Sequence, residues 1–162
     1  DHKSIQLSLT PGDWLDSALI AGAGAEAAWE TVEGFWAPRP WLAVDGCPAV
    51  RRDPLQGVST APSPQTVGLA AVFATGSSRL AQRNGRAYRY TVRAEGDQPL
   101  VAPEGGYRLV LEGRVVAFPG GRAIRCRAPG PDQRPVCIAA VQLDRVAFER
   151  ADGEALGEWR KG

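Results

Sequence analysis

The sequence is almost devoid of histidine, since His2 is the only one among 162 residues. Ser-His-Asp and Cys-His catalytic centres need an imidazole base, and a histidine beside a chain end is poorly placed to supply it. Zinc sites of histidine and cysteine are excluded on similar grounds, because His2 and three scattered cysteines are too few ligands. We therefore expect no catalytic centre of this kind, no metal site and no cofactor.

Long hydrophobic runs are also missing. The longest, Val67 to Ala74, has the length of a strand, whereas a membrane-spanning helix needs about 20 apolar residues. The sequence therefore predicts no transmembrane segment. It has no methionine, not even at position 1, and it contains cysteines, which favours a processed chain whose signal peptide has been removed. We expect a periplasmic or secreted protein.

Helix signals gather in the first third of the chain. Thr10 to Asp13 has the cap, proline and acid of a helix start, and Ala25 to Glu33 has apolar residues at helical spacing before Gly34. Prolines then predict an extended stretch that carries two tryptophans. Residues 1–53 are thus expected to form an acidic, helical and Trp/Pro-rich N-terminal segment that packs on the body.

Strand patterns dominate the rest of the chain. Val67 to Ala74 is apolar on both faces, whereas the later runs mostly alternate apolar and polar residues. The expected strands are Val67–Ala74, Tyr88–Arg93, Tyr107–Val115, Arg122–Arg127 and Val136–Phe148, with a tight turn at Asn84-Gly85 and a bulge near Gln142.

These elements predict a mainly β fold with an N-terminal helical segment, in the α+β class. Residues 66–150 would form a small OB-like or half-open β-barrel, and residues 151–162 a tail. A small β-sandwich is the alternative architecture.

Two cysteines suggest a disulfide. Cys126 and Cys137 lie eleven positions apart and flank a loop with three prolines. A bridge across such a loop stabilises the fold by roughly 3 kcal/mol on the loop-entropy argument. Three cysteines allow three single pairings, of which we favour Cys126 with Cys137. Cys47 would then be a small buried residue in a Gly-Cys-Pro turn, because no CxxC pattern or basic partner stands beside it.

Arginine supplies nearly all the positive charge, and with a formal net charge of +1 the overall balance indicates no partner. The stretch from Pro54 to Ala94 contains five arginines and no acidic residue. Three of them, Arg79, Arg83 and Arg86, are candidates for binding an anionic ligand. Nucleic acid is not expected, because the interleaved tyrosines should point inward and the compartment is oxidising. The alternative is internal, with the acidic residues 13–33 docking on this face.

Tryptophans offer a second candidate contact. Trp36 and Trp41 stand among prolines, and we expect them to be partly exposed and to bind a partner protein. Trp14 and Trp29 fall within the predicted helices and are expected to fasten them to the sheet.

Carboxylate chemistry is a third reading of the chain. Glu112, Asp144 and Glu149 lie on or at the end of predicted strands, and two of them facing each other across a cleft would suit a hydrolase. Their spacing gives no support to this reading, since strand carboxylates commonly face solvent or pair with arginine.

One stretch carries a resemblance. Val67 to Tyr90 reads VGLAAVFATGSSRLAQRNGRAYRY, a strand, an NGR turn and a second strand. It resembles the small periplasmic β-domains of secretion-system subunits, and this resemblance assigns no residue a role. Overall the sequence favours a non-catalytic accessory or interaction subunit of a larger envelope complex, with a protein partner that could be membrane-embedded. The alternative is a small β-barrel that binds an anionic ligand or an oligosaccharide.

Overall fold

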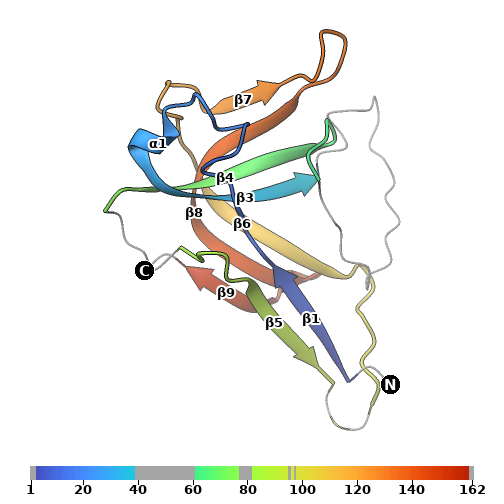
Figure 1. Cartoon of the computed structure of the whole chain (residues 1–162). Helices are drawn as coiled ribbons and strands as arrows, with labels where there is room; N and C mark the ends of the chain where they lie inside the picture. Colours follow the sequence, from blue (N-terminus) through green and yellow to red (C-terminus); the bar gives the residue numbers. More distant parts are fainter. Residues whose placement is uncertain (1–2, 39–60, 77–81, 95, 97, 161–162) are drawn as a thin grey trace.

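The computed structural model describes residues 3–38, 61–76, 82–94, 96 and 98–160 (Figure 1). Within them the chain forms nine strands and one four-residue helix. The elements are β1 (Ser4–Leu9), β2 (Gly12–Asp13), α1 (Ala25–Ala28), β3 (Trp29–Pro38), β4 (Thr66–Ala74), β5 (Tyr88–Arg93), β6 (Tyr107–Val115), β7 (Ile124–Arg127), β8 (Val136–Arg150) and β9 (Ala155–Arg160).

Strand β8 is the axis of the main sheet. Cys137 of β8 pairs with both the parallel β4 and the antiparallel β7, so these two strands lie on opposite edges of β8. Val141 pairs with β4 and β6, which places β6 on the same edge as β7. β9 pairs with the C-terminal half of β8, and β3 extends the sheet beyond β4. A central strand of 15 residues can thus serve four neighbours.

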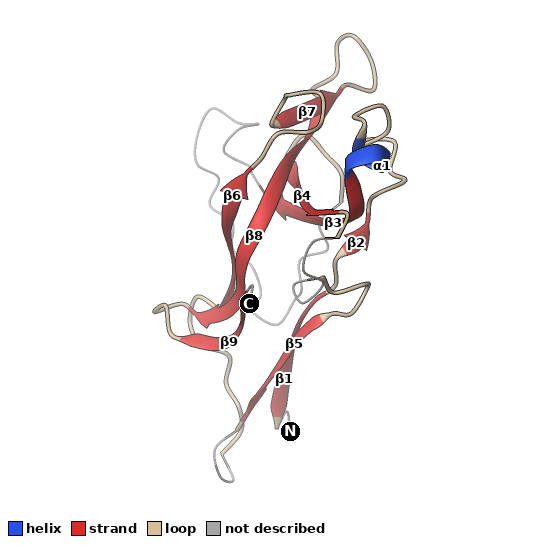
Figure 2. Ribbon diagram, turned by 90° about the vertical axis from the view of Figure 1, so that its left-hand side faces the viewer, coloured by secondary structure: helices blue, strands red, loops and turns tan. Residues whose placement is uncertain are grey.

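The main sheet curls into a half-barrel, with β8 curving from β7 at one end to β9 at the other (Figures 1 and 2). β1 and β5 form a separate antiparallel pair that lies beside β9. The predicted half-open β-barrel class is confirmed at this level, while the OB-like topology stays a prediction.

The predicted N-terminal helices are wrong. Gly12–Asp13 is strand β2, and only Ala25–Ala28 is helical before the chain enters β3. The sequence Trp29–Pro38 is a strand because it pairs along its length with β4, and its β-branched and aromatic residues suit a sheet. The strand pairing with β4 outweighs the helical spacing of the apolar residues in this segment. β1 and β3, from the segment predicted as residues 1–53, are thereby paired with β5 and β4 of the body.

Gly34, expected to end a helix, instead lies inside β3 against the ring of Trp14. A Cβ atom at Gly34 would lie 1.9 Å from Cδ2 of Trp14, so no larger residue fits without moving the indole. A Cβ atom at Gly68 would lie 2.8 Å from Cη2 of the same ring. Two glycines on neighbouring strands therefore form the seat of Trp14.

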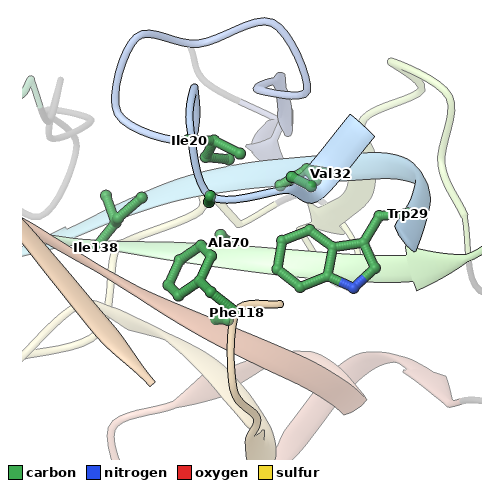
Figure 3. Packing of buried hydrophobic residues seen from close by; sticks show 9 residues of the cluster. Ile20, Trp29, Val32, Ala70, Phe118 and Ile138 are labelled. Atoms are coloured by element: carbon green, nitrogen blue, oxygen red, sulfur yellow. The ribbon is translucent and has the colours of Figure 1, made fainter. Parts of the chain in front are cut away.

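Both faces of the central strands are apolar, and each face carries its own core cluster. The first cluster lies under the loop that precedes α1 (Figure 3). Trp29 and Phe118 meet there with ring centroids 5.5 Å apart. Its buried members are Ile20, Ala23, Ala25, Trp29, Val32, Ala70, Phe118, Ile138 and Ala140.

The second cluster lies on the opposite face and is covered by strands rather than loops. Trp159 of β9 packs edge-on against Tyr88 of β5 and Phe148 of β8. Its buried members are Phe35, Ala71, Tyr88, Ala139, Val141, Val146 and Phe148. The reading of Val67 to Ala74 as a strand apolar on both faces is therefore confirmed.

The other strand predictions also hold, with shifts at the ends. β7 begins at Ile124, and β8 extends to Arg150. Asp144 is an extra residue in β8 opposite β6, which is the bulge expected near Gln142. Residues 151–162 had been expected as a tail, but the chain turns back and forms β9, which pairs with β8.

Candidate functional site

Arg83 and Arg86, two of the arginines predicted to bind a ligand, lie at a tight turn. Asn84 and Gly85 both have positive φ angles, 48° and 77°, as a type I′ turn requires, and the N–H group of Arg86 closes the turn on the carbonyl oxygen of Arg83 at 2.8 Å. Nη2 of Arg83 donates to the carbonyl oxygen of Ala87 at 2.9 Å, and Nε of Arg86 donates to that of Arg83 at 3.2 Å. Both guanidinium groups thus bind carbonyls of their own loop. Their ligand-binding role stays a prediction, and Arg79 lies outside the described residues.

Glu33 fastens this turn to strand β3. Its carboxylate is buried, and Oε1 accepts the backbone N–H groups of Arg83 at 2.6 Å and Asn84 at 2.9 Å. Burial raises the pKa of Glu33 above its ordinary value, although the two hydrogen bonds act in the opposite sense. The sequence placed Glu33 at the end of an acidic helix, so its role was missed.

Tyr88 sits beside this carboxylate. Cζ of Arg83 lies 4.8 Å from the centre of the Tyr88 ring, and burial, aided by the charge of Glu33, raises the pKa of Tyr88 to about 12. A cavity of about 280 Å³ opens nearby. Its walls are Pro11, Gly12, Asp13, Thr31, Glu33, Asn84 and Gly85. Two carboxylates give this cavity acceptors for hydrogen bonds, while its neighbouring arginines are turned to backbone carbonyls.

The tryptophans predicted to contact a partner are only partly described. Trp36 lies on β3, half-buried, with its ring centroid 4.8 Å from that of Trp14, and it packs against the first core cluster. Trp41 and Cys47 lie outside the described residues. A partner-binding role for Trp36 and Trp41 stays a prediction.

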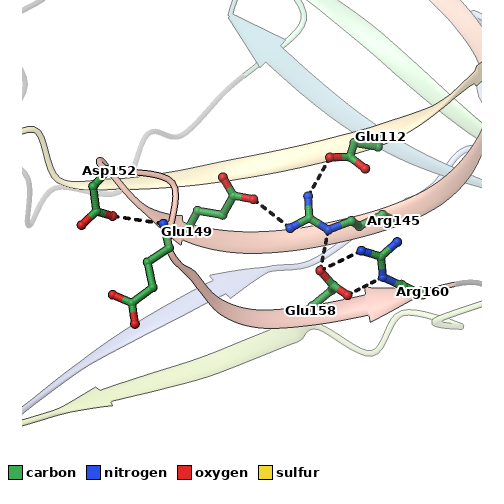
Figure 4. A network of polar contacts seen from close by, with 7 residues as sticks. Glu112, Arg145, Glu149, Asp152, Glu158 and Arg160 are labelled. Atoms are coloured by element: carbon green, nitrogen blue, oxygen red, sulfur yellow. Dashed lines mark hydrogen bonds and ion pairs between the residues drawn. The ribbon is translucent and has the colours of Figure 1, made fainter.

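Arg145 is the centre of an ion-pair cluster that joins three strands (Figure 4). Its guanidinium group donates to Glu158 at 2.6 Å, to Glu112 at 2.7 Å and to Glu149 at 2.8 Å. Arg160 binds Glu158 in turn. The Arg145 side chain is only 10% exposed, and the hydrogen bonds that it donates to Glu149 and then Glu158 raise the pKa of its guanidinium group above the ordinary value of arginine. We call these five residues the Arg145 cluster.

The carboxylates considered for hydrolysis are all bound to arginine. Glu112 and Glu149 belong to the Arg145 cluster. Asp144, at the bulge, instead pairs with Arg114 at 3.3 Å in an exposed ion pair. A catalytic carboxylate must reach the substrate with a free oxygen, whereas each of these carboxylates accepts a hydrogen bond from an arginine of the fold. The geometry therefore favours a structural role for Glu112 and Glu149.

The disulfide predicted from the sequence agrees with the geometry. Cys126 of β7 and Cys137 of β8 are partners in the strand register, and their sulfur atoms lie 2.00 Å apart. The bond ties the short edge strand β7 to the central strand.

Two neighbouring cavities lie along β7. One cavity of about 500 Å³ is lined by Arg122, Arg125 and Phe118, among others. A second of about 290 Å³ is lined by Arg125, Arg127 and Ala21, among others. Both share Arg125 and Cys126 in their walls, and we call the pair the β7 groove. The sequence showed its arginines only as the polar side of a strand.

No family model, no curated protein and no solved structure matches this chain. Among the described residues, no group of three His, Cys, Asp or Glu side chains is placed to hold a metal ion. No helix in the described part of the chain is long and apolar enough to cross a membrane.

Proposed function

We propose that this chain is a non-catalytic interaction subunit of a larger envelope complex in the periplasm or outside the cell. The observation that carries the proposal is an apolar stripe along the β6–β7 edge. Leu109, Val115 and Ile124 are 43%, 63% and 57% exposed. Their register partners on β8 all belong to the second core cluster, so the stripe continues a core face into solvent.

The strand edge beside this stripe also offers backbone groups. Within the described residues, β8 is the only strand that pairs with β6 or β7, so their outer edge has no strand neighbour there. A long edge strand with apolar side chains is a template on which a partner can add a strand, using main-chain hydrogen bonds and side-chain contacts together. A partner protein that covers the stripe is the occupant this surface fits best.

Two further features support the proposal. A disulfide is compatible with an oxidising, non-cytoplasmic compartment, where such bonds persist. The strand carboxylates that a hydrolase would use are held in ion pairs with arginine. Trp36 and Trp41 would extend the contact, and replacing Trp41 with alanine is expected to weaken it.

The test places a photo-crosslinking amino acid at Val115 in the full-length gene product of the native host. We expect one protein to crosslink in stoichiometric amount, and the substitutions Val115→Glu and Ile124→Glu to abolish its co-purification without lowering Tm. The same crosslinker at Arg89, exposed on β5, is the matched control and should stay unlinked. Crosslinking that is equal at the two positions, or absent from both, would contradict the proposal.

A further inference from the structure

The arginines of the β7 groove have no acidic partners among the described residues. The ion pairs among the described residues involve arginines of β6, β8 and β9. None of them involves Arg122, Arg125 or Arg127. Arg125 shares one cavity with Arg122 and the other with Arg127, so like charges line each cavity, and concave walls concentrate their field. The groove therefore has a surplus of positive charge that the described fold does not neutralise.

Arg125 is held in place at the centre of the groove. Its Nη1 and Nη2 atoms donate to the carbonyl oxygens of Ile20 and Ala21, each at 3.3 Å, and its Cζ lies 5.9 Å from the centre of the Phe118 ring. These contacts use only part of the five donors of a guanidinium group. A fixed side chain with donors to spare is suited to binding an oxyanion, because little conformational entropy remains to be lost.

The floor of the groove is also rigid. The disulfide joins β7 to β8 at Cys126, in the wall that both cavities share. At the larger cavity, the N–H group of Phe118 donates to the carbonyl oxygen of Arg122 at 2.8 Å, and that of Gly121 donates to Phe118 at 2.7 Å. The turn that carries Arg122 is thereby closed on itself and needs no partner to order it.

The arrangement of the arginines indicates the shape of the ligand. Arg122 and Arg125 line the larger cavity, and Arg125 and Arg127 line the smaller one. Arg125 and Arg127 lie two positions apart on one strand, so their Cα atoms are separated by about 7 Å. We propose that the β7 groove binds a small anion with two oxyanion groups, one in each cavity, and Arg125 between them. The larger cavity borders the apolar stripe at Ile124, and its arginines add a separate, charged function to that edge.

Calorimetric titration of the disulfide-intact chain with pyrophosphate, succinate and inorganic phosphate tests this proposal. Pyrophosphate and succinate carry two oxyanion groups, and inorganic phosphate carries one. We expect at least one of the two-group probes to bind with 1:1 stoichiometry and roughly tenfold or more above inorganic phosphate, since removing one charge-assisted hydrogen bond weakens binding by about that factor. Which of the two binds separates a phosphate ligand from a carboxylate ligand.

Arg122→Gln and Arg127→Gln are the diagnostic variants, because both side chains are exposed and lie outside the ion pairs described above. Each should weaken the two-group probe about tenfold, and Arg89→Gln, which removes the same charge from β5, should change it less than about twofold. Unchanged Tm values would show that the variants fold. Absence of binding by all three probes, or equal weakening by Arg89→Gln, would overturn the site.

Discussion

Arg145 and Arg125 show how differently one fold can use the same side chain. Both lie on or beside the central strand β8, and both hold several hydrogen bonds. Arg145 forms ion pairs with three carboxylates, one each from β6, β8 and β9, so its charge is compensated within the protein. Arg125 meets two backbone carbonyls and an aromatic ring, which orient it and leave its charge uncompensated.

Substituting an arginine that has acidic partners should therefore change stability, whereas substituting one without them should change ligand binding. A buried ion-pair cluster holds strands together, and removing its cation leaves several carboxylates without a partner. An arginine without an acidic partner keeps its charge available to a ligand. The Arg145 cluster should therefore govern stability, and the β7 groove should govern binding.

Breaking the Arg145 cluster is expected to have the largest effect on stability. Arg145→Met leaves Glu149 and Glu158 without their shared cation, and we expect thermal unfolding to show Tm lowered by on the order of 10 °C. Glu112→Gln is the matched control, since Glu112 is 55% exposed and its replacement should lower Tm much less. Equal Tm values for the wild type and Arg145→Met would show that the cluster is not structural.

Breaking the disulfide should loosen the groove and spare the cluster. Replacing Cys126 and Cys137 with serine is expected to lower the free energy of unfolding in urea by about 3 kcal/mol, because the closed loop is released. Hydrogen exchange should accelerate at the amides of β7 and remain slow at those of β9. Equal acceleration in both strands would mean that the two regions are not independent.

Glu33 and Glu158 should make the stability of the fold depend on pH in opposite directions. The pKa of Glu33 is raised by burial, so its proton stabilises the fold at low pH, and this contribution is lost as pH rises from about 4.5, the ordinary pKa, through the folded-state pKa. The pKa of Glu158 is lowered by hydrogen bonds from Arg160 and then Arg145, so its contribution is present above about 4.5 and is lost as pH falls.

Urea unfolding across pH measures both effects. Relative to wild type, Glu33→Gln should gain stability as pH rises, whereas Glu158→Gln should lose it. Glu33→Ala, which leaves the N–H groups of Arg83 and Asn84 without an acceptor, should cost about 2 kcal/mol at any pH. If the two glutamine variants changed in parallel with pH, the assigned causes of the pKa shifts would be wrong.

The smallest effect is expected at the exposed ion pair of Arg114 and Asp144. Their side chains are 67% and 45% exposed, so solvent screens the pair, and Arg114→Gln should change the free energy of unfolding by less than about 0.5 kcal/mol. A much larger loss would mean that exposure does not separate structural from dispensable arginines in this fold.

The strands of the body could be predicted because each carries its own alternation or apolar run. β4, β5, β6 and β8 were recognised in this way, and the Cys126–Cys137 pair followed from a proline-rich loop that needed closing. The first half of β3, Trp29 to Glu33, was misread as a helix because its identity depends on pairing with β4, a partner that local spacing does not reveal. The second half lies in the stretch that the prolines predicted to be extended.

The candidate sites were harder to predict than the strands, for a similar reason. Glu33 binds a turn fifty positions away, and Arg145 draws its acids from β6 and β9, so neither contact has a local signal. One feature of the sequence pointed toward the β7 groove: Arg125 and Arg127 stand at alternate positions on either side of Cys126. The alternation alone showed them only as the polar side of a strand. The loop that contains Ile20 completes the groove, and the fold alone brings this loop beside Arg125.

The most direct test of the contrast is an NMR titration that follows the arginine Nε–Hε signals while pyrophosphate or succinate is added. We expect the signals of Arg122, Arg125 and Arg127 to shift together and saturate with one of these probes, while that of Arg145 stays in place. Shifts of similar size across all arginines, or none in the groove, would contradict the division between a structural and a binding arginine.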